Sequence, residues 1–250
     1  MKGVLLAGGS AQRLRPLTKV TNKHLLPVYK KPMIYYPLET LLNAGIKDIL
    51  IVTGGEHIGH FFNLLGTGKE WGARFSYEIQ EGSGGTGAAL LLAEKFVNDR
   101  EFMVILGDNV VSENVGRFIE DFKKDTEKFK AKVLIAKVND PEKYGVVTFK
   151  GNKIVDIVEK PKKPKSNYVN TGLWMFMPEV FSLLKKLKKS PRGEYEVTDV
   201  LSHYVKSEQL SYSILKSQWT DAGSFESLYK ATVLMKKLED KEMKRKKAKK

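Results

Sequence analysis

The sequence predicts an α/β fold, in which a mostly parallel sheet carries helices on both faces. Short apolar runs, typical of buried strands, alternate along the chain with longer segments whose apolar residues recur at helical spacing. Repeated strand–helix–strand order favours parallel strands, because each crossover returns the chain to the edge where the previous strand began. The 250 residues, of which 42% are hydrophobic, are enough for one sizeable domain with a full core. We therefore expect a single domain over residues 1–235.

Apolar patterns and glycines define the elements of the first half. The run at residues 3–7 stops at Gly8, the helical pattern at residues 32–44 stops at Gly45, and the run at residues 48–53 is closed by Gly54. The other expected strands are 74–79, 102–106 and 132–137, and the other expected helices are 57–65, 86–97 and 115–129. Ligands of such a sheet bind at the carboxyl ends of its strands, so polar residues at those ends are candidate site residues.

The second half predicts a smaller β-rich subdomain. Residues 146–150 and 153–159 flank the turn dipeptide Gly151-Asn152, which predicts a β-hairpin. A strand is expected at 168–177, a helix that begins at Pro178 at 178–188, a helix at 197–206 and a last strand at 210–215. Acidic and lysine residues at the ends of these strands could hold a second substrate.

Charge and composition narrow the possible functions. Of the formal net charge of +14, residues 236–250 contribute nine Lys or Arg against three acids. We expect this basic tail to be disordered or frayed, and we expect no nucleic-acid partner, since the remaining positive charge suits small anionic substrates. The absence of cysteine excludes disulfides and thiolate metal sites. No apolar run approaches the roughly 18 residues that span a bilayer, so a cytoplasmic protein without a membrane partner is expected.

A phosphate-binding loop is the first candidate site. Gly8-Gly9-Ser10 follows the first expected strand, and Arg13 lies just beyond it. Glycines let backbone N–H groups approach phosphate oxygens, and an arginine adds a fixed fork of donors. A tight turn without a ligand explains the glycines equally well. The spacing excludes both the G-x-G-x-x-G dinucleotide fingerprint and the G-K-[ST] of a P-loop.

Further candidate polar groups lie at the ends of expected strands, in loops, or, for Lys23, a short loop beyond the arginines. A strand-end aspartate is a turn cap as often as it is a metal ligand, and a lysine at a hairpin end is usually solvated, so each is weak evidence alone. These candidates are Lys23, Gln80, Asp108, Glu159, Lys160 and Asp221.

Together and in this order, the motifs resemble those of the sugar-1-phosphate nucleotidyltransferases, and within that family the short glucose-1-phosphate thymidylyltransferases. The family loop G-G-S-G-T-R-L is similar to residues 8–14, and the family segment K-x-L-x-P-V-Y-x-K-P-M-I-Y-Y-P-L is similar to residues 23–38. The signatures G-D-N, Y-G-V, E-K-P, T-G-L, G-E-x-E-V-T-D and W-x-D-x-G recur at Gly107, Tyr144, Glu159, Thr171, Gly193 and Trp219. The resemblance covers residues 1 to about 225. It implies a Rossmann-like sheet with a sugar-binding subdomain, and a homo-oligomer.

The resemblance also implies a reaction and a set of roles. The enzyme would join a nucleoside triphosphate, dTTP or UTP, to glucose 1-phosphate by in-line attack on the α-phosphate, and would release pyrophosphate. Catalysis would rest on positioning and on neutralisation by cations, with Mg²⁺ as the cofactor held by Asp108 and Asp221. Arg13 would hold the β- and γ-phosphates, Lys23 the α-phosphate and Lys160 the sugar phosphate. The sugar would contact Gly145, Glu159 and Asn170, and the nucleotide would contact Leu6, Gly8, Gly9, Ser10, Gln80 and Gly85.

The chain departs from the family pattern in two loops. Ala11 stands in place of the third loop glycine and Gln12 in place of threonine, and an alanine at positive φ would strain the loop by roughly 1–2 kcal/mol. Residues 84–89 depart from the usual family pattern G-L-A-x-A, so the sequence does not decide whether the nucleotide substrate is dTTP or UTP. The alternative function is a catalytically degenerate paralogue that binds a nucleotide sugar and regulates a partner. An RNA-binding module is disfavoured because Tyr35, Tyr36 and Phe61 have the spacing of core residues.

Overall fold

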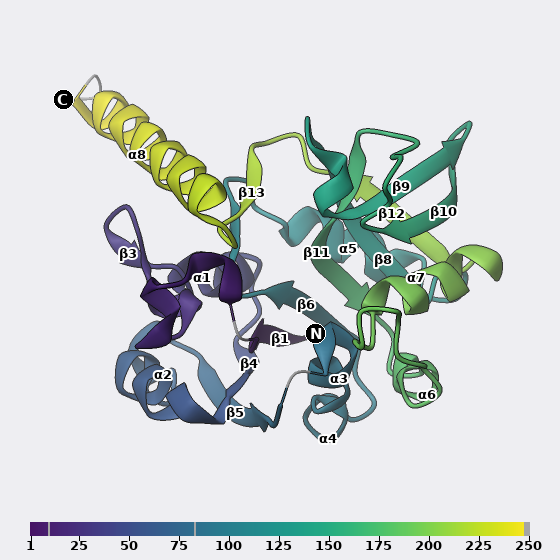
Figure 1. Ribbon diagram of the computed structural model, residues 1–250, viewed down its shortest axis with the longest axis horizontal. Coiled ribbons are helices and arrows are strands. Elements are labelled where there is room, and N and C mark those ends of the chain that lie inside the picture. Colours follow the sequence, from purple (N-terminus) through teal and green to yellow (C-terminus); the bar gives the residue numbers. More distant parts are fainter. Residues whose placement is uncertain (10, 83, 248–250) are drawn as a thin grey trace.

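The computed structural model describes residues 1–9, 11–82 and 84–247. Its centre is a nine-stranded sheet with the order β10-β9-β11-β6-β1-β4-β5, in which β8 also pairs with β11, and β12 with β8 (Figure 1). Two small sheets pair β2 (Pro27–Val28) with β3 (Lys31–Pro32), and β7 (Asn109–Val111) with β13 (Trp219–Asp221). The strands of the large sheet are β1 (Lys2–Ala7), β4 (Asp48–Gly54), β5 (Arg74–Gln80), β6 (Phe102–Leu106), β8 (Ala131–Lys137), β9 (Gly145–Lys150), β10 (Lys153–Glu159), β11 (Tyr168–Phe176) and β12 (Leu210–Ile214).

The large sheet has a parallel and an antiparallel part. Strands β6, β1, β4 and β5 run parallel, with Leu6 opposite Leu106. β11 runs antiparallel to β6, β8 and β9 and so joins the first half of the chain to the hairpin β9–β10. The predicted α/β fold and the predicted hairpin are confirmed. β7 and β13 were not predicted.

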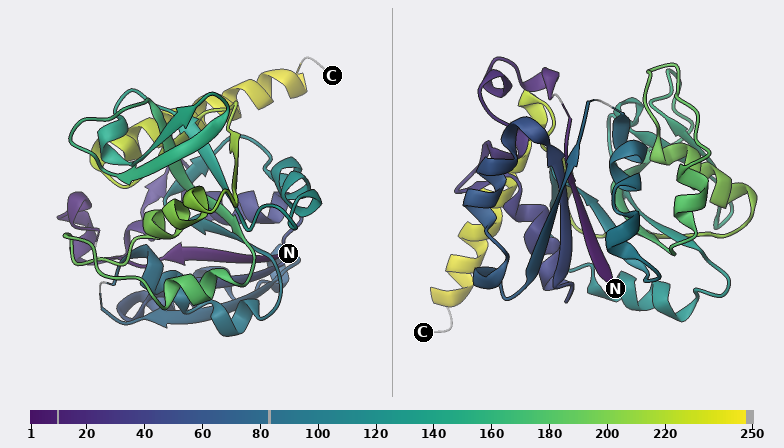
Figure 2. Two further views of the ribbon diagram at one scale, coloured as in Figure 1. Left: turned by 90° about the vertical axis from the view of Figure 1, so that its right-hand side faces the viewer. Right: turned by 90° about the horizontal axis from the view of Figure 1, so that it is seen from below.

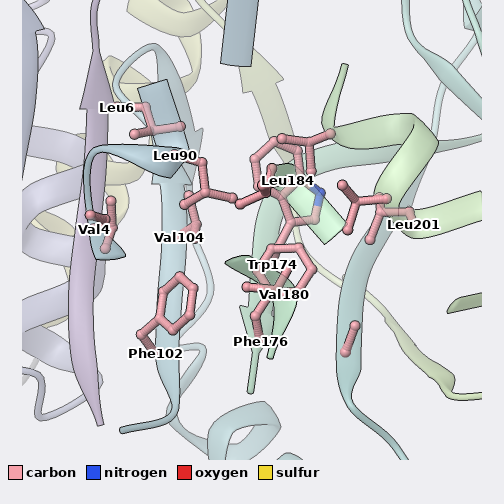
Figure 3. Close-up of a cluster of buried hydrophobic side chains, with 14 of the residues drawn as sticks. Val4, Leu6, Leu90, Phe102, Val104, Trp174, Phe176, Val180, Leu184 and Leu201 are labelled. Atoms are coloured by element: carbon pink, nitrogen blue, oxygen red, sulfur yellow. The ribbon is translucent and has the colours of Figure 1, made fainter. Parts of the chain in front are cut away.

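Helices cover both faces of the sheet, as the view from below in Figure 2 shows. Because successive side chains of a strand point to opposite faces, Val4 and Leu6 of β1 pack in one buried cluster, while Leu5 and Ala7 pack in another. Figure 3 shows the first cluster, which includes Leu90, Leu184 and Leu201 from three helices. The helices on that face include α3 (Gly85–Leu91), α6 (Val180–Leu184) and α7 (Val197–Lys206), and those on the other face include α1 (Tyr35–Asn43), α2 (Ile58–Leu65) and α5 (Gly116–Lys124).

The helix limits agree with the sequence prediction only in part. α7 has the predicted limits, whereas the helix predicted over residues 86–97 is divided into α3 and a separate short α4 (Glu94–Val97). The helices predicted over residues 115–129 and 178–188 are shorter, because α5 ends at Lys124, two residues after the buried Phe122, and α6 covers only Val180–Leu184.

The basic tail differs from the prediction. Residues 236–247, predicted to be disordered or frayed, continue helix α8 (Phe225–Lys247), which extends from the body in Figure 1. Ala231 and Leu234 of α8 are buried, and Leu238 packs against the same third apolar cluster. These positions lie three or four residues apart, so they share one face of the helix, which packs against the body. Residues 248–250 lie outside the described residues. No helix among the described residues is both long and apolar enough to cross a membrane.

Candidate active site

The candidate site lies where parallel strands end. The glycine loop begins after Ala7 at the end of β1, and Asp108 follows the end of β6. The backbone N–H of Gly107 donates to the carbonyl of Leu6 at 2.8 Å, which places these two loops side by side. The carboxyl ends of neighbouring parallel strands are the usual place for a ligand in an open α/β sheet.

A short strand pair brings Asp221 to Asp108. β13 runs antiparallel to β7, with Asp221 opposite Asn109, and the N–H of Ala222 donates to the carbonyl of Asp108 at 2.8 Å. The indole of Trp219 donates to Asn109 Oδ1 and fixes the same corner. Two carboxylates distant in the sequence are therefore placed together by the backbone.

The two carboxylates and the Arg13 guanidinium surround a small space beside Gly223. Oδ2 of Asp221 and Oδ2 of Asp108 lie 3.1 and 3.3 Å from the position that a Cβ on Gly223 would occupy, and Nη2 of Arg13 lies 2.9 Å from it. A side chain at residue 223 would fill this space. Carboxylate oxygens suit a hard divalent cation such as Mg²⁺. No group of three or more His, Cys, Asp or Glu able to hold a metal occurs among the described residues, so water or substrate would supply the other ligands.

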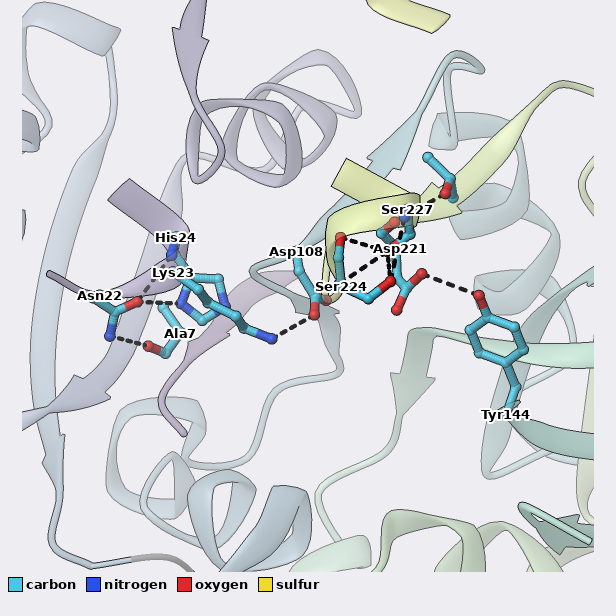
Figure 4. A network of polar contacts seen from close by, with 10 residues as sticks. Ala7, Asn22, Lys23, His24, Asp108, Tyr144, Asp221, Ser224 and Ser227 are labelled. Atoms are coloured by element: carbon cyan, nitrogen blue, oxygen red, sulfur yellow. Dashed lines mark hydrogen bonds and ion pairs between the residues drawn. The ribbon is translucent and has the colours of Figure 1, made fainter. Parts of the chain in front are cut away.

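The charges around the two carboxylates differ (Figure 4). Lys23 Nζ donates to Asp108 Oδ2 at 2.6 Å, and the Tyr144 hydroxyl donates to Asp221 Oδ1 at 3.0 Å. Burial by itself would raise the pKa of Asp108, but the charge and hydrogen bond of Lys23 and the other positive charge nearby, Arg13 included, together outweigh it and hold that pKa below its usual value. Burial, reinforced by the negative charge of Asp108, raises the pKa of Asp221. A cation between the two would offset this repulsion.

The glycine-loop backbone is strained at one residue. Ala11 has φ 44° and ψ 42°, the left-handed conformation that favours glycine. Its carbonyl accepts a hydrogen bond from Thr18 Oγ1 at 2.9 Å. The strain expected if alanine replaced a loop glycine at positive φ is therefore present.

A cavity of about 220 Å³, here called the glycine-loop cavity, contains the predicted nucleotide-binding residues that are described. Gln80 Nε2 donates to the carbonyl of Gly85 at 3.2 Å, and a side chain at Gly8 would collide with the Gln80 amide. Ser10 lies outside the described residues. The predicted residues that line this cavity are Leu6, Gly8, Gly9, Gln80 and Gly85.

A second cavity of about 300 Å³, here called the hairpin cavity, adjoins the first. Glu159 accepts from Thr198 Oγ1 at 2.7 Å, and its other oxygen lies 3.8 Å from Lys160 Nζ. Asn170 Oδ1 accepts from the Trp174 indole at 2.7 Å. Lys23 and Asp108 line both cavities. The predicted residues that line the hairpin cavity are Arg13, Lys23, Asp108, Gly145, Glu159, Lys160, Asn170 and Asp221.

Sequence reasoning missed several residues that line these cavities. Asn109 is 1% exposed, and its Nδ2 has no hydrogen-bond partner among the described residues, although it borders the hairpin cavity. Arg192 Nη1 lies 3.4 Å from Glu159 and 3.3 Å from Glu196. His24 is buried in the wall of the glycine-loop cavity. Asn109 lies in the G-D-N signature and Arg192 directly precedes the signature at Gly193, so the sequence did contain a signal for both. His24 occupies a variable position of its motif, so the sequence contained none for it.

The fold and site are those of a phosphate-handling α/β enzyme, and comparison with known proteins defines its family. The nucleotidyl transferase family matches residues 2–237. The chain belongs to this family and is a nucleotidyltransferase.

Named relatives are similar over most of their length. The chain is 42% identical over 235 residues to a glucose-1-phosphate thymidylyltransferase of Xanthomonas campestris, covering 92% of this chain and 79% of the relative. The corresponding Neisseria gonorrhoeae protein is also 42% identical, with 92% and 81% covered.

Solved structures agree with this assignment. A Bacillus anthracis protein, provisionally named a glucose-1-phosphate thymidylyltransferase and crystallised with sucrose, superimposes with a TM-score of 0.89 at 47% identity over 94% of both chains. A UDP-glucose pyrophosphorylase complexed with UDP-glucose superimposes with a TM-score of 0.82 at 27% identity, over 94% of this chain and 98% of that one.

Proposed function

We propose that the enzyme joins dTTP to glucose 1-phosphate, giving dTDP-glucose and pyrophosphate, with UTP as the alternative nucleotide. The names of the similar proteins support the substrate pair. The observation that carries the proposal is the meeting of two cavities at Lys23 and Asp108. One cavity has the glycine loop and Gln80, as a nucleotide site would, and the other has Glu159 and Lys160, as a sugar phosphate site would.

The reaction needs no protein nucleophile. An oxygen of the sugar phosphate attacks the α-phosphorus, the new P–O bond forms, and the bond from the α-phosphorus to the oxygen that bridges the β-phosphate breaks. Both electrons of that bond leave with pyrophosphate. Two anions must be brought into line, so positioning and charge neutralisation supply the catalysis.

The chain's own residues fit these tasks. Lys160 binds the sugar phosphate, while Lys23, whose Nζ lies beside Asp108, binds the α-phosphate. Arg13 holds the β- and γ-phosphates and stabilises the charge that grows on the leaving pyrophosphate. Asp108 and Asp221 would hold Mg²⁺, which supplies further neutralisation when it is bound.

Pyrophosphate release from a panel of triphosphates and sugar 1-phosphates tests the proposal. We expect dTTP with glucose 1-phosphate to give the highest kcat/KM. Asp108→Asn and Asp221→Asn should each lower kcat by roughly 10²-fold or more, with partial recovery at high Mg²⁺ or with Mn²⁺. The exposed Asp99, changed to Asn, is the matched control and should leave kcat unchanged. Near-full rates in both site variants, or turnover by chelator-treated protein, would refute the shared metal.

A further inference from the structure

Lys23 is the first residue of the short 3₁₀ helix η3 (Lys23–Leu25), and a buried polar residue lies on each side of it. Asn22 is 6% exposed and His24 is 1% exposed, whereas the Lys23 side chain reaches into both cavities. Figure 4 shows the three side chains together, with Lys23 directed at Asp108. None of the roles proposed above uses Asn22 or His24.

A chain of hydrogen bonds ties these residues to the end of β1. The backbone N–H of His24 donates to Asn22 Oδ1 at 3.0 Å, and Nδ1 of the His24 ring lies 2.7 Å from the same oxygen. Asn22 Nδ2 donates in turn to the carbonyl of Ala7 at 3.3 Å. Because Ala7 is the last residue of β1, the segment that carries Lys23 is anchored to the strand that leads into the glycine loop.

The His24 ring also packs against the strand end that carries Asp108. A Cβ on Gly107 would stand 2.7 Å from Cδ2 of the ring and 3.0 Å from Nε2, so the ring lies directly against this glycine. Asn22 and His24 together therefore contact the end of β1 and the glycine that follows β6. Since Asn22 Oδ1 can only accept, the ring carries its proton on Nδ1. Burial, with the charge of Lys23, lowers the pKa of His24 to about 3, so the ring adds no positive charge beside Lys23.

We propose that Asn22 and His24 are positioning residues for Lys23, acting as one unit that fixes its backbone so that Nζ lies beside Asp108 and the α-phosphate. Lysine has four rotatable side-chain bonds, so its ammonium can be placed well only if its Cα is held. The assignment rests on the proposed function, because it presumes that Lys23 acts on a phosphate.

A double-mutant cycle with Lys23 tests the proposal. His24→Ala should lower kcat about tenfold, with the KM for glucose 1-phosphate changed less than twofold. In a Lys23→Ala background the same substitution should change kcat less than twofold, because the residue through which it acts is gone. Asn22→Ala should behave in the same way, and Asn22→Ala with His24→Ala should lose no more than the worse single variant.

Two further measurements separate positioning from simple loss of structure. His24→Gln keeps an N–H donor for Asn22, so its kcat should lie within threefold of wild type. This variant also tests the role of residue 24 if His24→Ala does not fold. The same double-mutant cycle is repeated with the dissociation constant of dTTP as the readout, measured by calorimetry without sugar phosphate. This readout does not depend on turnover. We expect His24→Ala to weaken this binding in wild type and to have less than a twofold effect in Lys23→Ala.

Equal losses from His24→Ala with and without Lys23, in kcat or in dTTP binding, would overturn the proposal and assign His24 a direct or purely structural role. A wild-type protein that binds dTTP but releases no pyrophosphate would refute the proposed function, while the binding cycle would still decide the role of His24.

Discussion

Tyr144→Phe should weaken metal activation without changing the site's shape. The Tyr144 hydroxyl donates to Asp221 Oδ1 at 3.0 Å, and the ring packs edge-on against Trp219 with centroids 5.3 Å apart. Phenylalanine keeps the ring and removes only the hydroxyl. This hydrogen bond stabilises the ionised carboxylate of Asp221 and so lowers its pKa. Its loss should therefore raise further a pKa that burial and Asp108 already raise.

The size of the effect follows from that single hydrogen bond. A hydrogen bond to a charged group contributes roughly 1.5–3 kcal/mol, and loss of a partner behind a metal ligand typically costs 10–100-fold in metal affinity. We expect the Mg²⁺ concentration for half-maximal rate to rise about tenfold or more, with kcat at saturating Mg²⁺ within threefold of wild type. Initial rates of pyrophosphate release over a Mg²⁺ series measure both.

A matched control separates this effect from the loss of any tyrosine hydroxyl. Tyr77 donates to the carbonyl of Gly66 at 2.6 Å, on strand β5 and outside both cavities. Tyr77→Phe should leave the Mg²⁺ dependence unchanged. If Tyr144→Phe also has the wild-type Mg²⁺ dependence while remaining folded, the hydroxyl does not support a metal ligand and the reasoning fails.

Two further substitutions and one truncation each test a single feature of the structure. Ala11→Gly should raise the free energy of unfolding by up to about 1 kcal/mol in urea titrations, because it relieves the left-handed conformation of Ala11; a loss of stability would contradict the strain. Truncation after Met235 removes the packing of Leu238, so Tm should fall by about 2–4 °C while kcat stays the same. A tenfold loss of kcat in the folded truncated protein would show that this end of α8 contributes to catalysis. An unfolded histidine has a pKa near 6.5, whereas the pKa of the buried His24 is lowered to about 3, so below pH 6.5 the unfolded chain binds a proton that the folded protein does not. The free energy of unfolding of the wild type should therefore fall by about 1.4 kcal/mol per pH unit below pH 6.5, and that of His24→Gln should not show this fall. Unfolding at pH 7 and pH 5 measures that difference, and equal pH dependence in the two proteins would contradict a buried neutral ring.

The sequence predicted elements best where local pattern and burial agree. α7 and the hairpin β9–β10 were predictable, since one has apolar residues at helical spacing and the other a glycine turn between alternating strands. β7 and β13 have three residues each and no pattern of their own, so only their pairing across the chain defines them. The tail was misjudged because its charge density hides the apolar face that continues α8 to Leu238.

Site residues could be predicted from the sequence where a motif assigned them a role. Other residues were identified only from their contacts in the structure. Asp108 lies just beyond β6 and Asp221 ends β13, but no local signal in the sequence predicts that they converge. Asn109 follows Asp108 in the quoted G-D-N motif, yet only the structure shows that its Nδ2 is buried without a partner among the described residues. His24 occupies a variable motif position, and its importance rests on hydrogen bonds to Asn22.

The two parts of the sheet separate the two halves of the proposed reaction. The glycine-loop cavity lies at the ends of the parallel strands, while β9, β10 and β11 contribute Gly145, Glu159 and Asn170 to the hairpin cavity. The pair β7–β13 brings Asp221 beside Asp108. A change confined to one cavity should therefore alter the KM of one substrate. Changes at the junction, where Lys23 and Asp108 line both cavities, should instead lower kcat, because in the proposed reaction the attacking phosphate and the α-phosphorus would meet there. The specificity for a base or a sugar can thus change in either cavity without rebuilding the catalytic residues.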